Sequence, residues 1–365
     1  MNATGPLSEL GQSLWLDNIT RTILEDGTLA RYIAEFSVTG LTSNPTIFDE
    51  AIGKGDAYDV GIAAKAARGL AGEVLFTELA LEDLRRAADL FRPVWDATDG
   101  RDGYVSMEVS PLLASDTQGT IDAALRICRD ADRPNLFVKI PGTPEGLPAI
   151  EAAIFAGVPV NVTLLFSQNQ YLAAAEAYIR GIERRLTGKL DPRIASVASV
   201  FVSRWDRAVA EKVPKALQNK LGIAVGEQTY LAYRTLLESP RWQALAAAGA
   251  TPQRLLWAST GVKDPGAPDT LYVEALAAPD TINTMPEKTL LAFADHGRIK
   301  GTLDAGGGDS GVVLARFAAA GIDVALLGAT LQRDGAAAFV KSWNELLAKI
   351  ASKSAALARA AAVAL

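Results

Sequence analysis

The sequence predicts an α/β fold in which eight parallel strands close into a single (β/α)8 TIM barrel with extra helices. Short apolar or β-branched runs recur along the chain, and longer alanine- and leucine-rich stretches lie between them. This alternation indicates βα units around a parallel sheet. The centre of the chain continues strand, helix, strand without a linker-like change in composition, so we expect one domain over residues 1–365.

The expected strands are short runs, and the expected helices are the amphipathic stretches between them. Two long segments, 56–93 and 218–250, have room for two helices each, and the chain ends in a helical extension over 335–362. The glycine-rich stretch 304–310 lacks the Lys-Ser/Thr of a P-loop, which favours a flexible connection over a phosphate cradle. The expected strands are residues 13–16, 37–41, 104–107, 136–140, 158–162, 194–200, 255–258 and 281–284, and helical stretches include 81–91, 170–186 and 207–217.

Composition narrows the class of protein. The net charge is −6 and no basic stripe with interleaved aromatic residues is present, which argues against nucleic-acid binding. Cys128 is a lone cysteine, no signal segment is evident, and no apolar run reaches the ~20 residues of a membrane helix, so we expect a cytoplasmic protein that does not enter a membrane. His296 is a lone histidine, so a multi-histidine metal site is excluded and no metal is expected.

Lys139 is the most informative residue because it lies inside the apolar run 135–141. Burial disfavours the charged ammonium and so favours the neutral amine, which can attack a carbonyl group. A lysine at a strand end that extends to solvent or pairs with a carboxylate is the alternative. The other strand ends favour the first interpretation, and Lys139 therefore indicates Schiff-base chemistry.

Polar residues end most of the expected strands. In a barrel the reacting groups come from the C-terminal ends of the strands, so these side chains should meet at one mouth. Each alone could be a helix cap or a loop hydrogen bond, but their convergence favours an active site. They are Asp17, Thr42, Asn44, Glu108, Lys139, Asn161, Thr163, Ser199 and Ser259.

Schiff-base chemistry on a sugar requires further groups besides Lys139. An acid must protonate the departing hydroxyl of the carbinolamine, and Glu108, acting through Thr163 and a water, is a candidate. Asp17 is suited to remove the proton of the β-hydroxyl. A sugar phosphate would also need a cation, for which Arg204 is the first choice and Lys263 the second. Either cation could instead be a solvated surface charge. Asn44, Asn161 and Ser199 could hydrogen-bond the sugar hydroxyls.

Six segments, in this order, resemble the transaldolases, which are class I aldolase-type barrels. The segments are LWLDNI at 14–19, GLTSNPT at 40–46, VSMEV at 105–109, FVKIP at 137–141, NVTLLFS at 161–167 and SVFVSR at 199–204. The resemblance runs over nearly the whole chain. The longer bacterial and plant-like branch is the more similar one, because Gly261 stands where another branch has an arginine, and Lys263 could supply that cation.

The resemblance implies transfer of a dihydroxyacetone unit from a ketose phosphate, such as fructose 6-phosphate or sedoheptulose 7-phosphate, to an aldose phosphate such as glyceraldehyde 3-phosphate or erythrose 4-phosphate. The pathway would be the non-oxidative pentose phosphate pathway, with no cofactor. Lys139 would form the Schiff base and Asp17 would be the general acid/base, while Glu108 and Thr163 would position the catalytic water. Substrate contacts would come from Thr42, Asn44, Asn161, Ser199, Phe201 and, at the phosphate, Arg204.

Two other functions remain open from the sequence. A Schiff-base aldolase of the fructose-6-phosphate type would release its fragment instead of transferring it. A sugar-phosphate-binding barrel without turnover would be expected to lack Lys139, Asp17 or Glu108, and all three are present. Trp343 and Leu347 on the last helix could pack on the barrel or form a dimer contact, so the sequence allows a monomer or a homodimer.

Overall fold

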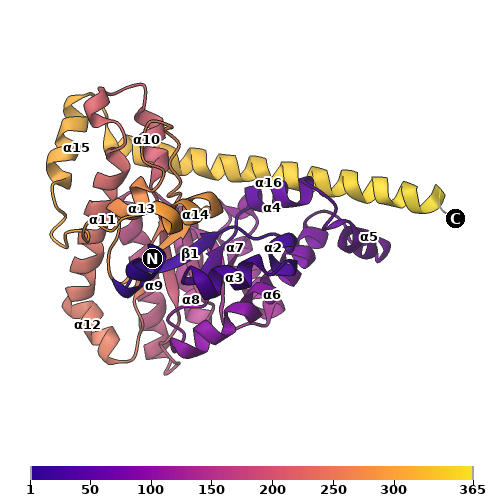
Figure 1. Ribbon diagram of the computed structural model, residues 1–365. Coiled ribbons are helices and arrows are strands. Elements are labelled where there is room, and N and C mark those ends of the chain that lie inside the picture. Colours follow the sequence, from indigo (N-terminus) through magenta and orange to yellow (C-terminus); the bar gives the residue numbers. More distant parts are fainter. Residues whose placement is uncertain (1, 364–365) are drawn as a thin grey trace.

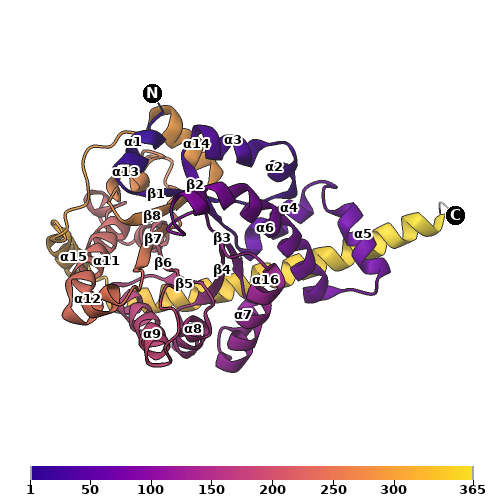
Figure 2. The same ribbon diagram turned by 90° about the horizontal axis from the view of Figure 1, so that it is seen from below.

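A computed structural model describes residues 2–363 and has eight parallel strands arranged in a ring with helices around it (Figures 1 and 2). The predicted barrel and all eight predicted strands are confirmed. The expected single domain includes residues 1, 364 and 365, which lie outside the described residues. The strands are β1 (Ser13–Asp17), β2 (Val38–Thr42), β3 (Val105–Glu108), β4 (Leu136–Pro141), β5 (Val160–Leu165), β6 (Ser196–Phe201), β7 (Gln253–Ala258) and β8 (Thr281–Met285).

The ring closes between β2 and β3. The continuous sheet has the order β2-β1-β8-β7-β6-β5-β4-β3, and every pairing in it is parallel. At the junction the Leu41 amide donates to the Tyr104 carbonyl over 2.9 Å, and the Gly103 amide donates to the Thr39 carbonyl over 2.8 Å. A Cβ on Gly40 would lie 2.8 Å from the Tyr104 carbonyl oxygen, so the two backbones can approach this closely because residue 40 is glycine.

The inside of the barrel is filled by side chains that alternate along each strand. Trp15 and Phe137 lie in contact with 6.1 Å between their ring centroids, and Tyr104 stacks on Phe137 at 4.1 Å. Asp17 follows Trp15 by two residues, and Lys139 follows Phe137 by two. Side chains two residues apart on a strand point to the same side, so Asp17 and Lys139 point into the barrel. They lie one layer above the rings of Trp15 and Phe137.

Helices form the outer layer, and several begin at the caps that their sequences indicate. Asn44 caps α4 by accepting from the Ile47 amide, and Ser167 caps α9 in a reciprocal pair with Gln170. Both long segments contain two helices as predicted. The helices are α1 (Thr4–Glu9), α2 (Arg21–Glu25), α3 (Thr28–Glu35), α4 (Pro45–Gly53), α5 (Asp59–Ala67), α6 (Gly72–Ala97), α7 (Thr117–Ala131), α8 (Gly146–Ala156), α9 (Gln168–Thr187), α10 (Ser203–Val209), α11 (Leu221–Glu238), α12 (Pro240–Ala247), α13 (Leu271–Ala275), α14 (Glu287–His296), α15 (Ser310–Ala319) and α16 (Val324–Val363), with short 3₁₀ turns η1 (Pro111–Leu113) and η2 (Lys215–Leu217).

The predicted helix over 207–217 is wrong. Helix α10 ends at Val209, and the chain then forms turns before the 3₁₀ turn η2. Pro214 immediately precedes η2, and a proline has no amide hydrogen for a helical hydrogen bond and clashes with the preceding turn. The helical stretches 81–91 and 170–186 are confirmed within α6 and α9, and residues 304–310 form a connection into α15.

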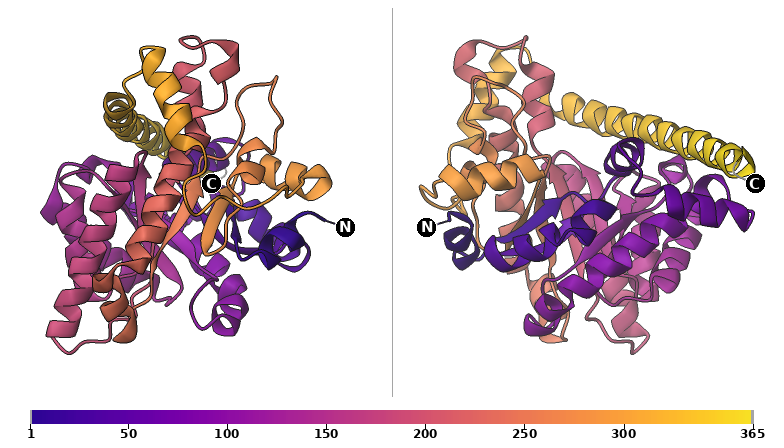
Figure 3. Two further views of the ribbon diagram at one scale, coloured as in Figure 1. Left: turned by 90° about the vertical axis from the view of Figure 1, so that its left-hand side faces the viewer. Right: turned by 45° about the vertical axis from the view of Figure 1, so that its right-hand side comes forward.

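The last helix, α16, is the most unusual element of the fold. It contains 40 residues and begins at Val324, eleven residues before the predicted extension, and its C-terminal part projects beyond the barrel (Figures 1 and 3). Trp343 is buried and meets the Phe76 ring edge-on with 5.1 Å between centroids, while Leu347 packs on the same core. Both side chains therefore pack on the barrel. Within residues 2–363 no single helix is long and apolar enough to span a membrane, although α15 and α16, which meet at 90°, reach that length and composition as a bent pair.

Candidate active site

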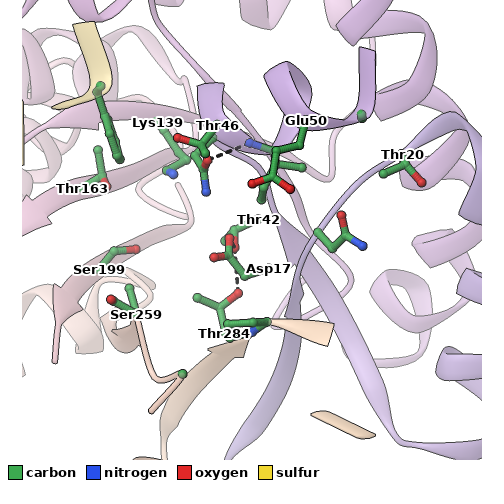
Figure 4. A pocket seen from close by; sticks show the side chains of 18 of the residues that line it. Asp17, Thr20, Thr42, Thr46, Glu50, Lys139, Thr163, Ser199, Ser259 and Thr284 are labelled. Atoms are coloured by element: carbon green, nitrogen blue, oxygen red, sulfur yellow. Dashed lines mark hydrogen bonds between the residues drawn. The ribbon is translucent and has the colours of Figure 1, made fainter. Parts of the chain in front are cut away.

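A cavity of about 600 Å³ lies at the C-terminal ends of the strands. Figure 4 shows side chains from several strands pointing into it, with Lys139, Thr163 and Ser199 along one side and Asp17, Thr42 and Thr284 in a group. The barrel thus brings together residues that are far apart in the sequence. Of the residues singled out from the sequence, ten line the cavity: Asp17, Thr42, Asn44, Lys139, Thr163, Ser199, Phe201, Arg204, Ser259 and Lys263.

Lys139 is held inside the barrel wall and is 4% exposed. Its Nζ donates to the Ser43 carbonyl over 2.9 Å and lies 3.5 Å from Oε2 of Glu108. Glu108 and Lys139 are direct partners across β3 and β4, which explains why the amine and the carboxyl meet. A buried amine with one carboxyl beside it can exchange a proton without help from solvent.

Glu108 and Thr163 both present polar atoms without protein partners. Neither carboxyl oxygen of Glu108 nor the Thr163 hydroxyl has a hydrogen-bond partner among the described residues, although all are buried. Burial raises the pKa of Glu108 above its ordinary value of 4.5, and the nearby Lys139 opposes this rise. Glu108 lines a small space beside Ser43 and Trp343 and does not line the main cavity. These atoms are available to bind a water or a departing hydroxyl near Lys139.

Asp17 is tied to two threonines at the other side of the cavity. The Thr42 hydroxyl donates to Oδ1 of Asp17 over 2.7 Å and lies 2.7 Å from the Thr284 hydroxyl. Burial raises the pKa of Asp17, against the opposing effects of Lys139, of the Thr42 hydrogen bond and of Lys263. A carboxyl with a raised pKa is closer to the range in which it can both take and return a proton.

Three predicted sugar contacts have different surroundings. Asn44 lines the cavity, but its side-chain oxygen caps α4, so its amide nitrogen is the group left for a ligand. Ser199 lines the cavity and donates to Asn161 Oδ1 over 2.7 Å. Asn161 is fully buried, donates to Ser106, and does not line the cavity. Asn161 therefore holds the Ser199 side chain in place and does not itself face the cavity.

Arg204 and Lys263 are the two cavity cations that the sequence singled out for a phosphate group. The Arg204 guanidinium lies 5.1 Å above the Phe201 ring and 5.9 Å above the Phe339 ring. Burial lowers the pKa of Arg204, with a smaller effect from Arg207 in the same direction. Lys263 is exposed and also lines a neighbouring cavity of about 310 Å³. Two positive charges at the rim make this part of the cavity suited to a phosphate group.

Several lining residues were not found from the sequence. Thr284 is the last residue but one of β8, and Asn18 directly follows Asp17, so the rule that strand ends face the mouth could have found both. Phe339 lies on α16, which follows the barrel strands in sequence, and no local pattern indicates that this helix reaches the mouth. Further lining residues come from the loop after β1 and from α4: Thr20, Thr46, Glu50 and Lys54.

Comparison with known proteins gives a consistent result. The sequence profile of the family described as "Transaldolase/Fructose-6-phosphate aldolase" matches residues 14–350. The chain is 48% identical over 359 residues to the transaldolase of Thermobifida fusca (strain YX), covering 96% of this chain and 98% of that protein. It is 45% identical to the transaldolase of Thiobacillus denitrificans (96% and 100% covered) and 44% identical to that of Mycobacterium bovis (93% and 94%). The residues matched by the family profile, 14–350, include the C-terminal ends of all eight strands.

Proposed function

The chain belongs to the transaldolase/fructose-6-phosphate aldolase family, and from this premise we propose that it transfers a dihydroxyacetone unit between sugar phosphates through a Schiff base on Lys139. The donor is a ketose phosphate, such as fructose 6-phosphate or sedoheptulose 7-phosphate. The acceptor is an aldose phosphate, such as glyceraldehyde 3-phosphate or erythrose 4-phosphate. The observation that carries the proposal is a buried lysine, 4% exposed, whose Nζ lies within 3.5 Å of a carboxyl oxygen at the wall of a polar cavity.

The reaction begins when the Lys139 amine attacks the ketone carbon of the donor to form a carbinolamine. Loss of water from it requires a proton for the departing hydroxyl. Glu108 is placed to provide that proton, because its raised pKa leaves it protonated over a wider pH range. Thr163, whose hydroxyl has no protein partner among the described residues, is placed to bind the water that carries it.

The protonated Schiff base, at the second carbon of the ketose, then accepts the electron pair of the bond between the third and fourth carbons, once the hydroxyl on the fourth carbon loses its proton. Asp17 is placed to take this proton from the opposite side of the cavity, and Thr42 holds the carboxylate through its 2.7 Å hydrogen bond. The aldose phosphate leaves, and the three-carbon enamine stays bound to Lys139. It next attacks the aldehyde of the acceptor, Asp17 returns the proton, and hydrolysis releases the new ketose phosphate.

Substrate orientation falls to the remaining lining groups. Ser199, held by Asn161, and the amide of Asn44 are placed to hydrogen-bond the sugar hydroxyls. We assign Arg204 to the phosphate, with Lys263 as the second cation, and Ser259 lines the same cavity. We further propose that residues 1–365 form one domain and that the protein acts in the cytoplasm, in the non-oxidative pentose phosphate pathway. Its partners would be sugar phosphates, and it would bind neither nucleic acid nor a membrane.

Reductive trapping tests this function. The protein is incubated with fructose 6-phosphate, reduced with borohydride, and analysed as intact protein and as peptides by mass spectrometry. A three-carbon adduct on Lys139 is expected, and adding erythrose 4-phosphate before the reductant should remove it with formation of sedoheptulose 7-phosphate. Release of free dihydroxyacetone without transfer would instead identify an aldolase. The absence of any adduct on Lys139 would contradict the Schiff-base mechanism and favour a sugar-phosphate-binding barrel.

A further inference from the structure

Helix α16 reaches the cavity by crossing the mouth of the barrel. Figures 1 and 2 show the helix running across one end of the molecule, and it contacts α4, α10 and β5. Two hydrogen bonds from Gln332 Nε2, each 2.9 Å long, reach the carbonyls of Gly142 and Leu164 at the ends of β4 and β5. Farther along, the hydroxyls of Ser342 and Thr46 lie 2.9 Å apart. The helix is therefore fixed in register above the strand ends.

One face of α16 is directed at Arg204. Gln332, Gly335 and Phe339 are three and then four residues apart, so they share a face of the helix. A Cβ on Gly335 would lie 3.2 Å from Nη1 of Arg204, and the Phe339 ring lies 5.9 Å from the Arg204 guanidinium carbon. The glycine allows the helix backbone to approach, and the aromatic ring then covers the guanidinium.

The way in which Arg204 is held matters for its chemistry. Among the described residues the guanidinium makes neither an ion pair nor a side-chain hydrogen bond, and its contacts are the rings of Phe201 and Phe339. A carboxylate partner would occupy the N–H donors and neutralise the charge. Aromatic faces orient the planar group through the ring quadrupole, and they leave the N–H donors free for phosphate oxygens.

We infer that Phe339 is a positioning residue for Arg204, through which α16 sets the preference of the site for phosphorylated over unphosphorylated sugars. This inference rests on the proposed function and adds a determinant of its substrate selectivity. Phe201 comes from the barrel wall, but Phe339 comes from a helix outside the eight βα units, so the phosphate side of the site is complete when α16 is docked.

The test compares a phosphorylated and an unphosphorylated donor, fructose 6-phosphate and fructose, with unphosphorylated erythrose as the acceptor, so that both donors give sedoheptulose as the product. Phe339→Leu keeps an apolar side chain but removes the aromatic face. We expect the ratio of kcat/KM for fructose 6-phosphate to that for fructose to fall by about five- to tenfold, chiefly through KM of the phosphorylated donor. Phe339→Tyr keeps the ring and should restore the ratio to within about twofold of the original protein.

Two further variants separate positioning from folding. Gly335→Ala introduces a Cβ 3.2 Å from Nη1 of Arg204 and 3.1 Å from Cδ2 of Leu164, so that these side chains must shift by a few tenths of an ångström, and a smaller loss with the same selectivity is expected. Lys341→Ala, on an exposed part of α16, is the control and should keep the ratio. If Phe339→Leu and Gly335→Ala weaken both donors equally, the role of α16 is structural and the inference is wrong. If the unsubstituted protein forms no Lys139 adduct with either donor, the proposed function itself fails.

Discussion

The Nζ of Lys139 lies 3.5 Å from Oε2 of Glu108, and both side chains are almost completely buried. The two residues are partners across adjacent parallel strands, so the distance is set by the sheet itself. The pKa of Glu108 is raised despite the lysine, which means that the cost of burying the carboxylate exceeds the attraction between the two charges. The sheet therefore holds a buried amine and a buried carboxyl side by side in the barrel wall.

Replacing Lys139 should abolish cleavage without unfolding the protein. For Lys139→Ala we expect a loss of roughly 10⁴-fold or more in kcat, because the other lysines that line the cavity, Lys54 and Lys263, are exposed instead of buried in the barrel wall. Circular dichroism and the thermal midpoint check the fold. Lys65→Arg is the matched control, since Lys65 is also buried but pairs with Glu82 and does not line the cavity. Turnover retained by Lys139→Ala would refute the Schiff-base mechanism.

Asp17→Asn should separate imine formation from bond cleavage. The amide cannot take the proton of the β-hydroxyl, so we expect kcat to fall by about 10²–10⁴-fold while the Schiff base still forms. Borohydride trapping with fructose 6-phosphate should then give a phosphorylated six-carbon adduct on Lys139 instead of the three-carbon one. The exposed Asp26→Asn gives the same chemical change away from the cavity. A variant that forms no adduct would assign to Asp17 the dehydration role given to Glu108.

Arg204→Ala should weaken binding of phosphorylated donors selectively. Loss of two charge-assisted hydrogen bonds should raise KM for fructose 6-phosphate by about 100-fold, with a much smaller effect on fructose. Arg207→Ala removes an equal charge from an exposed site on the same helix, outside the main cavity, and serves as the control. Equal effects of Arg204→Ala on the two donors would remove Arg204 from the phosphate site.

Glu108→Gln should change how stability depends on pH. Because the pKa of Glu108 is raised in the folded state, the folded protein binds more protons than the unfolded chain between the ordinary value of 4.5 and the folded-state pKa. The free energy of unfolding therefore falls as pH rises through this window. Glutamine does not titrate, so the variant should not show this decrease. We expect the thermal midpoint of the variant to match the unsubstituted protein near pH 4 and to exceed it at pH 7.

The scale of that shift is at most about 2–4 °C for each kcal/mol, because the entropy of unfolding grows with chain length. Glu211→Gln, at an exposed position, controls for the change in net charge. A midpoint for Glu108→Gln that drops below that of the unsubstituted protein as pH rises would show that pairing with Lys139 outweighs burial.

Gly40→Ala should destabilise the closure of the barrel. The new Cβ would lie 2.7 Å from ring atoms of Trp15 and 2.8 Å from the Tyr104 carbonyl oxygen, so β2 and β3 would have to separate. The expected cost is about 1–3 kcal/mol, measured by urea unfolding. Gly311→Ala in α15 is the control, because its Cβ would meet no atom within 4 Å and alanine favours a helix. Equal stability of both variants would show that the junction between β2 and β3 can adjust.

The amino-acid pattern was sufficient to predict the strands and most of the site. Strand alternation and burial are local properties, and a polar residue at the end of a parallel strand must face the mouth once the barrel closes. This is why Lys139, Asp17 and Thr163 could be found before the structure, and why Thr284 could have been. The one incorrect helix, over 207–217, also has a local cause, since Pro214 interrupts the pattern.

Long-range packing decided the rest. Asn161 lies on a strand whose end faces the mouth, as predicted. Its side chain is nevertheless fully buried and hydrogen-bonds Ser106 and Ser199 instead of pointing into the cavity. Phe339 does not lie at a strand end, so the rule for strand ends could not find it. It reaches Arg204 because Gln332 fixes α16 at the strand ends and Gly335 allows the helix to approach Arg204 closely. The sequence by itself determined the barrel and the position of Lys139 inside it, because residue periodicity and burial act over a few residues. The tertiary structure decided what surrounds the phosphate cation, because the path of a helix after the barrel depends on contacts between residues more than a hundred positions apart.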